Sequence, residues 1–267
     1  GVATPRRKTT MTRFIAMFLV STLCTTNAAL GDIEQYADCD GNGTLFLTEL
    51  DPVPGVFLDD LYLGCADLAR ANLRFSSFDR ADLSVANLSG ANLSTAYLVQ
   101  TNLSLADLSG AKLRSAILSE AILSGANLTD ANLSQSDLTL ANLSDADLSD
   151  ARLTGALLTE ADLTAADLEG ADLSGAILVG AIFSHAILTS ADLTATDIKD
   201  ADFSLTDLSG TSLQGAIYNS ATLFSSEFDP KGQGMIYIGP SADLSGVDLA
   251  GADLSGANLR GANLSDA

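Results

Sequence analysis

ADLTAADLEGADLSGAILVGA, the stretch from Ala161 to Ala181, repeats a pattern of five residues: Ala, then Asp or Asn, then Leu, then Ser or Thr, then a variable residue. From Val56 to Pro230 the 267-residue chain divides into 35 consecutive pentapeptides of this kind. A repeat of fixed length determines the architecture before any local preference for helix or strand.

A period of five fits neither regular element. In a helix, successive Leu side chains would drift by roughly 140° around the axis, and in a strand they would alternate between faces. One apolar surface results only if each unit is a short extended piece followed by a turn, with Ala and Leu pointing inward. Gly at the fifth position, as in Gly155 and Gly175, favours such a turn because Gly tolerates φ > 0.

The repeated A(D/N)LXX unit resembles the motif of the pentapeptide-repeat family. That resemblance implies an all-β solenoid, a right-handed quadrilateral β-helix with four pentapeptides per coil. At about 4.8 Å per coil, 35 units would form a rod about 42 Å long. We expect stacked Leu side chains in its core. We also expect inward Thr or Ser wherever they replace the first Ala, at Thr101, Ser136, Thr196, Thr206 and Thr211.

A spacing of twenty sorts the outward second positions into four columns. One column is largely apolar and reads Phe57, Ser77, Tyr97, Ile117, Asp137, Leu157, Ile177, Asp197 and Ile217. Contiguous exposed apolar residues are typical of contact sites. We therefore predict an interface for a protein partner or for self-association at Tyr97, Ile117, Leu157, Ile177 and Ile217; simple packing between coils is the alternative. The opposite column, from Asp67 to Glu227, is almost entirely acidic or amide, which favours loosely held counterions.

Residues 1–28 have the pattern of a secretory signal. A basic flank from Arg6 to Arg13 precedes the apolar stretch Phe14–Cys24, and a small-residue cleavage site lies near Ala28. We therefore predict export to a periplasmic, lumenal or extracellular space; an uncleaved anchor or a buried segment is the alternative. The apolar stretch is too short to span a bilayer, so no stable membrane insertion is expected.

Residues 29–55 form a separate N-terminal module, which contains the sequence DCDGNGTLFLTEL from Asp38 to Leu50. It resembles an EF-hand calcium loop, in which oxygen ligands recur at fixed positions around one ion. The resemblance assigns Ca²⁺ binding to Asp38, Asp40, Asn42, Thr44 (through its carbonyl) and Glu49. An apolar residue at the ninth position and two prolines after the loop depart from the pattern, so we expect weak binding. A turn that only caps the rod is the alternative.

Charge and cysteine content limit the possible partners. After removal of the signal, 9 Lys and Arg face 34 Asp and Glu, which gives a net charge of −25. Such acidity argues against direct binding to nucleic acid. In an oxidising compartment Cys39 and Cys65 could form a disulfide, or they could remain two thiols.

The repeat breaks at residues 231–241 and resumes at Ala242, one residue out of phase. We expect a distorted coil edge with a bulge in which Ile236 and Ile238 point inward; a protruding loop that presents Met235 and Tyr237 is the alternative. Residues 242–267 continue the repeat, and we expect the natural chain to extend further.

No constellation of catalytic residues is present in the sequence, because its one histidine, His185, has no nucleophile or acid placed beside it. We therefore predict a non-enzymatic, exported rod that acts as a structural or protein-interaction scaffold. The family resemblance also implies an alternative, because some intracellular members mimic duplex DNA and bind type II topoisomerases.

Overall fold

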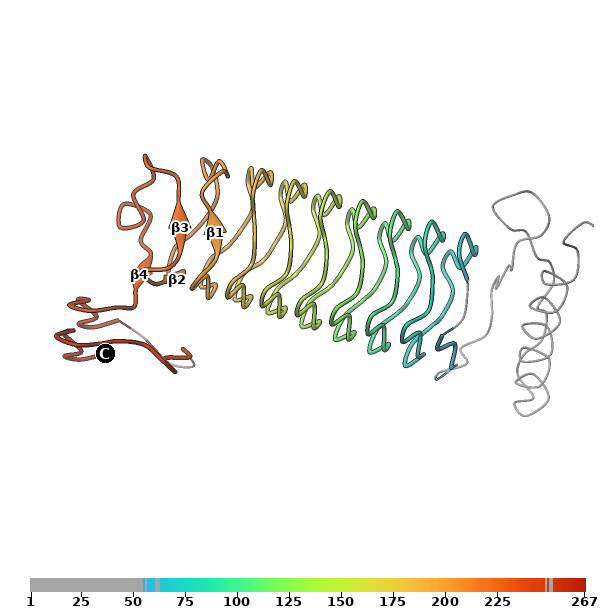
Figure 1. Ribbon diagram of the computed structural model, residues 1–267, viewed down its shortest axis with the longest axis horizontal. Helices are drawn as coiled ribbons and strands as arrows, with labels where there is room; N and C mark the ends of the chain where they lie inside the picture. Colours follow the sequence, from blue (N-terminus) through green and yellow to red (C-terminus); the bar gives the residue numbers. More distant parts are fainter. Residues whose placement is uncertain (1–54, 56, 61–62, 248, 250–251) are drawn as a thin grey trace, which may run out of the picture.

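The computed structural model of the protein describes residues 55, 57–60, 63–247, 249 and 252–267. Successive coils stack along one long axis, from the blue end to the orange end of the rod in Figure 1. Parallel β-bridges join residues twenty positions apart, such as Tyr97 and Ile117. With one turn in every five residues, twenty residues make a four-sided coil, and the described residues contain no helix.

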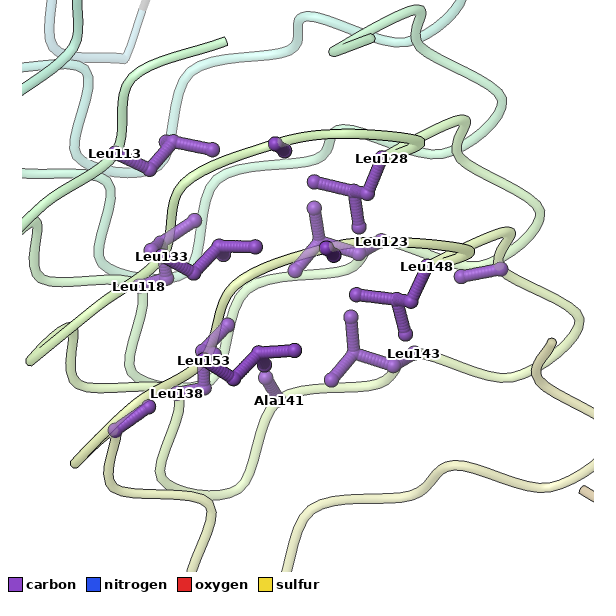
Figure 2. Close-up of a cluster of buried hydrophobic side chains, with 14 of the residues drawn as sticks. Leu113, Leu118, Leu123, Leu128, Leu133, Leu138, Ala141, Leu143, Leu148 and Leu153 are labelled. Atoms are coloured by element: carbon purple, nitrogen blue, oxygen red, sulfur yellow. The ribbon is translucent and has the colours of Figure 1, made fainter. Parts of the chain in front are cut away.

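The core is the interior of this β-helix. Ala at the first position and Leu at the third are buried in coil after coil, and most are completely excluded from solvent. Figure 2 shows the Leu side chains, from Leu113 to Leu153, stacked in columns between successive coils. Each buried Leu contributes about 1.5–3 kcal/mol, so stability accumulates along the rod.

The backbone hydrogen bonds of one pentapeptide explain why the motif needs all its positions. In residues 86–90 the N–H of Ala86, at the first position, donates to the carbonyl of Leu83 within the turn (3.1 Å). The N–H of Asn87, at the second position, donates to a carbonyl of the preceding coil (2.8 Å). The third (2.7 Å) and fifth (2.8 Å) donate to the following coil. The fourth donates to the side-chain oxygen of Asn87 (3.2 Å). Every N–H is satisfied, and the Asp or Asn at the second position supplies the acceptor that the backbone lacks.

The turns place the fifth residue in the left-handed region of the backbone map. Every fifth residue from Asp60 to Gly215 has φ between 55° and 80°, with Leu205 as the exception. The sequence indicated Gly for this position, yet most turns use other residues, including the β-branched Val85 and Thr95. An L-residue there costs roughly 1–2 kcal/mol, which the packing on either side of the turn outweighs.

The predicted inward hydroxyl residues are confirmed as buried. Each hydroxyl donates to a backbone carbonyl inside the rod, as Thr101 Oγ1 does to the carbonyl of Phe78 at 2.7 Å. Ser76 is equally buried, and its hydroxyl has no partner among the described residues. The core therefore holds small hydroxyl side chains, and the five predicted ones are satisfied by backbone carbonyls.

Four short strands mark the point where the regular register ends. β1 (Asp202–Phe203) pairs with β3 (Leu223–Phe224), and β2 (Ile217–Tyr218) pairs with β4 (Ile236–Tyr237), both in parallel. The first pairing spans 21 residues and the second 19. One pairing is therefore one residue longer than a regular coil of twenty, and the next is one residue shorter. The phase of the repeat changes before Pro230, earlier than the sequence predicted.

The register shift corrects the expected orientation of the break. Met235 lies inside the core with 8% of its surface exposed, whereas Ile236 pairs with the outward Ile217. Ile236 therefore points out of the rod rather than into it, because the pairing is one residue shorter than a regular coil. Tyr237 packs against Tyr218 with ring centroids 5.3 Å apart, so the segment is a distorted coil edge at this point.

Aromatic side chains fill the core beside this shift. Phe183 and Phe203 stack with centroids 4.6 Å apart, and Phe203, Phe224 and Phe228 continue the stack at 6.0 and 5.0 Å. Stacked rings of this kind add to the apolar burial. The larger rings therefore accompany the coils in which the twenty-residue register is lost.

Candidate functional site

The predicted apolar column is one continuous ladder in the structure. Parallel bridges connect its members from Phe57 to Ile217, twenty residues at each step. Tyr97 is 48% exposed, Leu157 39% and Ile177 38%, while Ile117 is half-buried. We call this column of outward residues the apolar face.

The C-terminal end of the apolar face is covered by the chain itself. Ile217 and Ile236 pack against a second buried cluster formed by Ile238, Ala242 and Leu244. Ile217 therefore contacts the protein's own C-terminal residues and is not free for a partner in this structure. The sequence did not reveal this contact, because it depends on the one-residue register shift.

The apolar residues of this face leave turn hydrogen bonds unmade. Where Ile117, Leu157 or Ile177 replaces Asp or Asn, the turn loses the side-chain acceptor for the N–H two residues later. Among the described residues, no group accepts the N–H of Ser119, Thr159 or Val179. A turn hydrogen bond contributes about 1 kcal/mol. Asp or Asn at these positions would therefore stabilise the turn more than Ile or Leu does.

The opposite column, which we call the acidic face, includes Asp107, Asp147 and Asp167 in one bridged ladder. Its carboxylates serve the turns: Asp147 accepts the N–H of Ser149 at 3.0 Å and its hydroxyl at 2.6 Å. These bonds hold the pKa of Asp147 below its usual value, with the Ser149 hydroxyl as the main cause. The acidic positions thus have a structural role beyond solvation.

Asp172, on a neighbouring side of the rod, shows the same balance. Burial alone would raise the pKa of Asp172. Opposing effects, chiefly the hydrogen bonds from the hydroxyls of Ser174 and Thr154, lower this pKa by more than burial raises it, so it lies below the usual value. In the described part of the chain, no three Asp, Glu, His or Cys side chains come together in a way that could hold a metal ion. The second-position carboxylates of Asp147 and Asp172 are turn acceptors.

The predicted calcium ligands Asp38, Asp40, Asn42, Thr44 and Glu49 lie outside the described residues, as do the signal segment and Cys39. Cys65 is disulfide-bonded. Its pairing with Cys39 stays a prediction, because no described residue is the partner.

His185 occupies an exposed turn with φ 61°. Ser184 and Ala186 flank it in the chain, and no described residue hydrogen-bonds to its ring. In the ranges that the structure covers, no helix has the length and apolar character needed to cross a membrane.

Four-sided coils, A(D/N)LXX units and a turn at every fifth residue define a pentapeptide-repeat β-helix. The family model for pentapeptide repeats matches eight copies, over residues 66–104, 106–145, 146–184, 186–223 and 241–267. The chain belongs to the pentapeptide-repeat family. No curated protein matches it.

Several solved structures of this family are similar to the chain. HetL, a protein involved in heterocyst differentiation regulation in the cyanobacterium Nostoc sp. PCC 7120, is 31% identical over 80% of this chain and 86% of its own, with a TM-score of 0.29. A thylakoid lumen protein of Arabidopsis thaliana is 30% identical over 40% of this chain and 72% of its own, with a TM-score of 0.36. QnrB1, a plasmid-mediated fluoroquinolone resistance protein, is 17% identical over 70% and 93%, with a TM-score of 0.42.

Proposed function

We propose that the protein is an exported, non-enzymatic rod that binds another protein through its apolar face and carries a weak calcium site at its N-terminal side. The observation that carries the proposal is the set of turn hydrogen bonds forgone along this face. Asp or Asn at position 117, 157 or 177 would complete a turn, yet the chain places a large apolar residue there. A contact with a partner is the physical benefit that would offset this loss.

The shape of the apolar face supports the same proposal. A β-helix side is a rigid surface with side chains at fixed intervals of about 4.8 Å, so a partner meets a prearranged ladder. Tyr97 adds an exposed aromatic ring to this face, a residue type enriched at interfaces. Binding to such a surface costs little ordering of the rod itself.

The double variant Ile117→Asp with Ile177→Asp tests the proposal. It restores the turn acceptors, so the rod should stay folded while self-association and capture of partners fall. Ile187→Asp is the matched control, because Ile187 is an isoleucine at the same second position of the repeat but belongs to the acidic face. Unchanged sedimentation mass and unchanged partner capture in the double variant would show that the apolar face is only packing between coils.

The calcium site rests on the loop sequence from Asp38 to Glu49, whose spacing places oxygen ligands around one ion. Residues 29–267 should release or absorb heat on titration with Ca²⁺, and Glu49→Gln should abolish that signal. Binding would order the residues next to the first coil, since metal binding and folding are coupled. If neither residues 29–267 nor the Glu49→Gln variant gives a heat signal with Ca²⁺, the proposed calcium site is wrong.

Export rests on residues 1–28, and cell fractionation tests it through the loss of this segment. The acidic face keeps the alternative of a duplex-DNA mimic open, because its bridged Asp ladder repeats negative charge at a constant interval. Unprocessed protein in the cytosol together with inhibition of a type II topoisomerase would favour that alternative. Processing without inhibition would favour the exported scaffold.

A further inference from the structure

Residues 242–267, the C-terminal segment, do not extend the core of the rod. Of these residues the structure describes 242–247, 249 and 252–267. They form a coil of their own: Asp243 bridges to Asn263, and the N–H of Leu244 donates to the carbonyl of Asn263 at 2.8 Å. In Figure 1 this coil, drawn in red, lies beside the end of the rod next to β2 and β4.

The register shift explains this position. Met235 is inward and Ile236 is outward, so the alternation along the chain also places Ile238 on the outer side. Ile238 is nevertheless only 3% exposed, because it joins Ala242 and Leu244 in a second cluster on that side. The C-terminal segment therefore packs its apolar interior on the outer surface of the apolar face.

Lys199 fixes the segment from the rod side. Its Nζ lies 3.2 Å from Asp197 Oδ2 and donates to the backbone carbonyl of Asp253 at 2.7 Å. The two side chains are only 12% and 14% exposed, whereas those of the ion pair Arg80–Asp60 are 55% and 63% exposed. A nearly buried ammonium group with two acceptors on different parts of the chain is a strong and specific tie.

We propose that the C-terminal segment is a detachable cover over one end of the apolar face and that Lys199 holds it closed. The Leu side chains of the segment are less buried than those of a rod coil: Leu254 and Leu259 are half-buried, and Leu264 is 45% exposed. A unit with little buried apolar surface opens at a lower free energy than the rod unfolds. Opening uncovers Ile217, Ile236 and Ile238, which lengthen the apolar face.

This cover makes binding competitive. A partner that docks along the whole apolar face must displace the C-terminal segment and break the Lys199–Asp253 contact. This consequence rests on the docking role proposed above, whereas the cover itself does not.

Trypsin measures the opening directly, because Arg260 lies within the segment and Lys231 lies in an exposed loop of the rod. Cleavage after Arg260, relative to cleavage after Lys231, should rise by about 10- to 100-fold in Lys199→Met, the factor expected for loss of a charge-assisted hydrogen bond. Lys112→Met changes the same charge at an exposed site and should leave the ratio unchanged. A ratio in Lys199→Met equal to that of the unmodified protein would overturn the proposal.

Asp197→Asn is the second test, because it removes the ion pair but keeps an oxygen that can accept the N–H of Lys199, as Asp197 Oδ1 does at 3.2 Å. It should raise the ratio in the same direction, by less than Lys199→Met. Circular dichroism separates release of the cover from unfolding of the rod. An unchanged ratio in Asp197→Asn would contradict the proposal even if Lys199→Met failed to fold.

Sedimentation distinguishes the cover from the docking role. If Lys199→Met increases both trypsin cleavage and self-association or partner capture, the cover and the docking function are both supported. If cleavage increases and capture does not, the cover stands and the docking function fails.

Discussion

Ala171–Ala176 and Ala252–Ala257 have the same sequence, ADLSGA, and lie in different environments. Both make the local turn bond, with the last Ala N–H donating to the Leu carbonyl at 2.9 and 3.1 Å. In both, the Asp side chain accepts the Ser N–H, at 3.0 and 2.8 Å. The two copies therefore fold locally in the same way.

Their long-range contacts differ. Leu173 is completely buried and its N–H donates to the next coil at 2.8 Å, whereas Leu254 is half-buried. No residue among those described accepts the N–H of Leu254. The pentapeptide specifies a turn, and stacking between coils on both sides specifies the core.

The largest predicted difference between these regions concerns the core Leu. Leu173→Ala should lower the free energy of unfolding by about 2–5 kcal/mol, because it leaves a cavity between two coils. Leu254→Ala should cost clearly less, since its side chain is already partly in water. Urea unfolding followed by circular dichroism measures both; equal losses would show that the C-terminal segment is packed as tightly as the rod.

The turns provide a smaller and more local comparison. Gly175 and Gly256 have φ of 65° and 69°, and a Cβ at either position would meet no atom within 4 Å. Val at either site should therefore cost roughly 1–2 kcal/mol of pure backbone strain. In Gly175→Val the loss should appear as a lower melting temperature of the rod.

Gly256→Val should instead increase hydrogen exchange in the C-terminal segment alone, because that segment opens separately. A drop in the melting temperature of the rod in Gly256→Val would contradict the distinction between the two regions.

Turns of the apolar face in which an apolar residue replaces Asp or Asn lack the side-chain acceptor of a regular turn, and this difference predicts a stability change of opposite sign. Ile177→Asn should leave stability unchanged or raise it by up to about 1 kcal/mol, because the new side chain can accept the N–H of Val179. Asp172→Ala, the reverse change at a regular turn, should lower stability by a similar amount. Thermal unfolding of the pair checks the prediction, and a clear loss in Ile177→Asn would contradict it.

Acid should produce the smallest effect per residue. The pKa values of Asp147 and Asp172 are lowered in the folded state, so their stabilising contribution is present above the unfolded value of about 3.9. It is lost as the pH falls through the lower folded values. The melting temperature should therefore stay level from pH 7 to 5 and fall below about pH 4.

Asp172→Asn should reduce this fall, since the amide keeps an acceptor and does not titrate. Stability that rose on acidification would show that repulsion among the carboxylates outweighs their hydrogen bonds.

Much of the architecture could be predicted from the sequence, because a five-residue period allows one solution for the inward Ala and Leu. The inward Thr residues follow from the same period, and the apolar column from Phe57 to Ile217 follows from the four pentapeptides per coil that the family resemblance implied. The cover over Ile217 and Ile236 could not be predicted, since it depends on one residue gained and one lost between β1 and β4. The role of Asp as a turn acceptor was missed, although its place two residues before the fourth-position N–H could have indicated it.

Deletion of residues 106–165 tests the central claim most directly. Ala106 and Ala166 occupy equivalent positions three coils apart, so the deletion removes whole coils and leaves every column aligned. X-ray scattering in solution should show the rod shortened by about 14 Å with its cross-section unchanged, three times the spacing of about 4.8 Å. A chain that keeps its length, or collapses into a compact particle, would contradict a fold built from stacked coils of twenty residues.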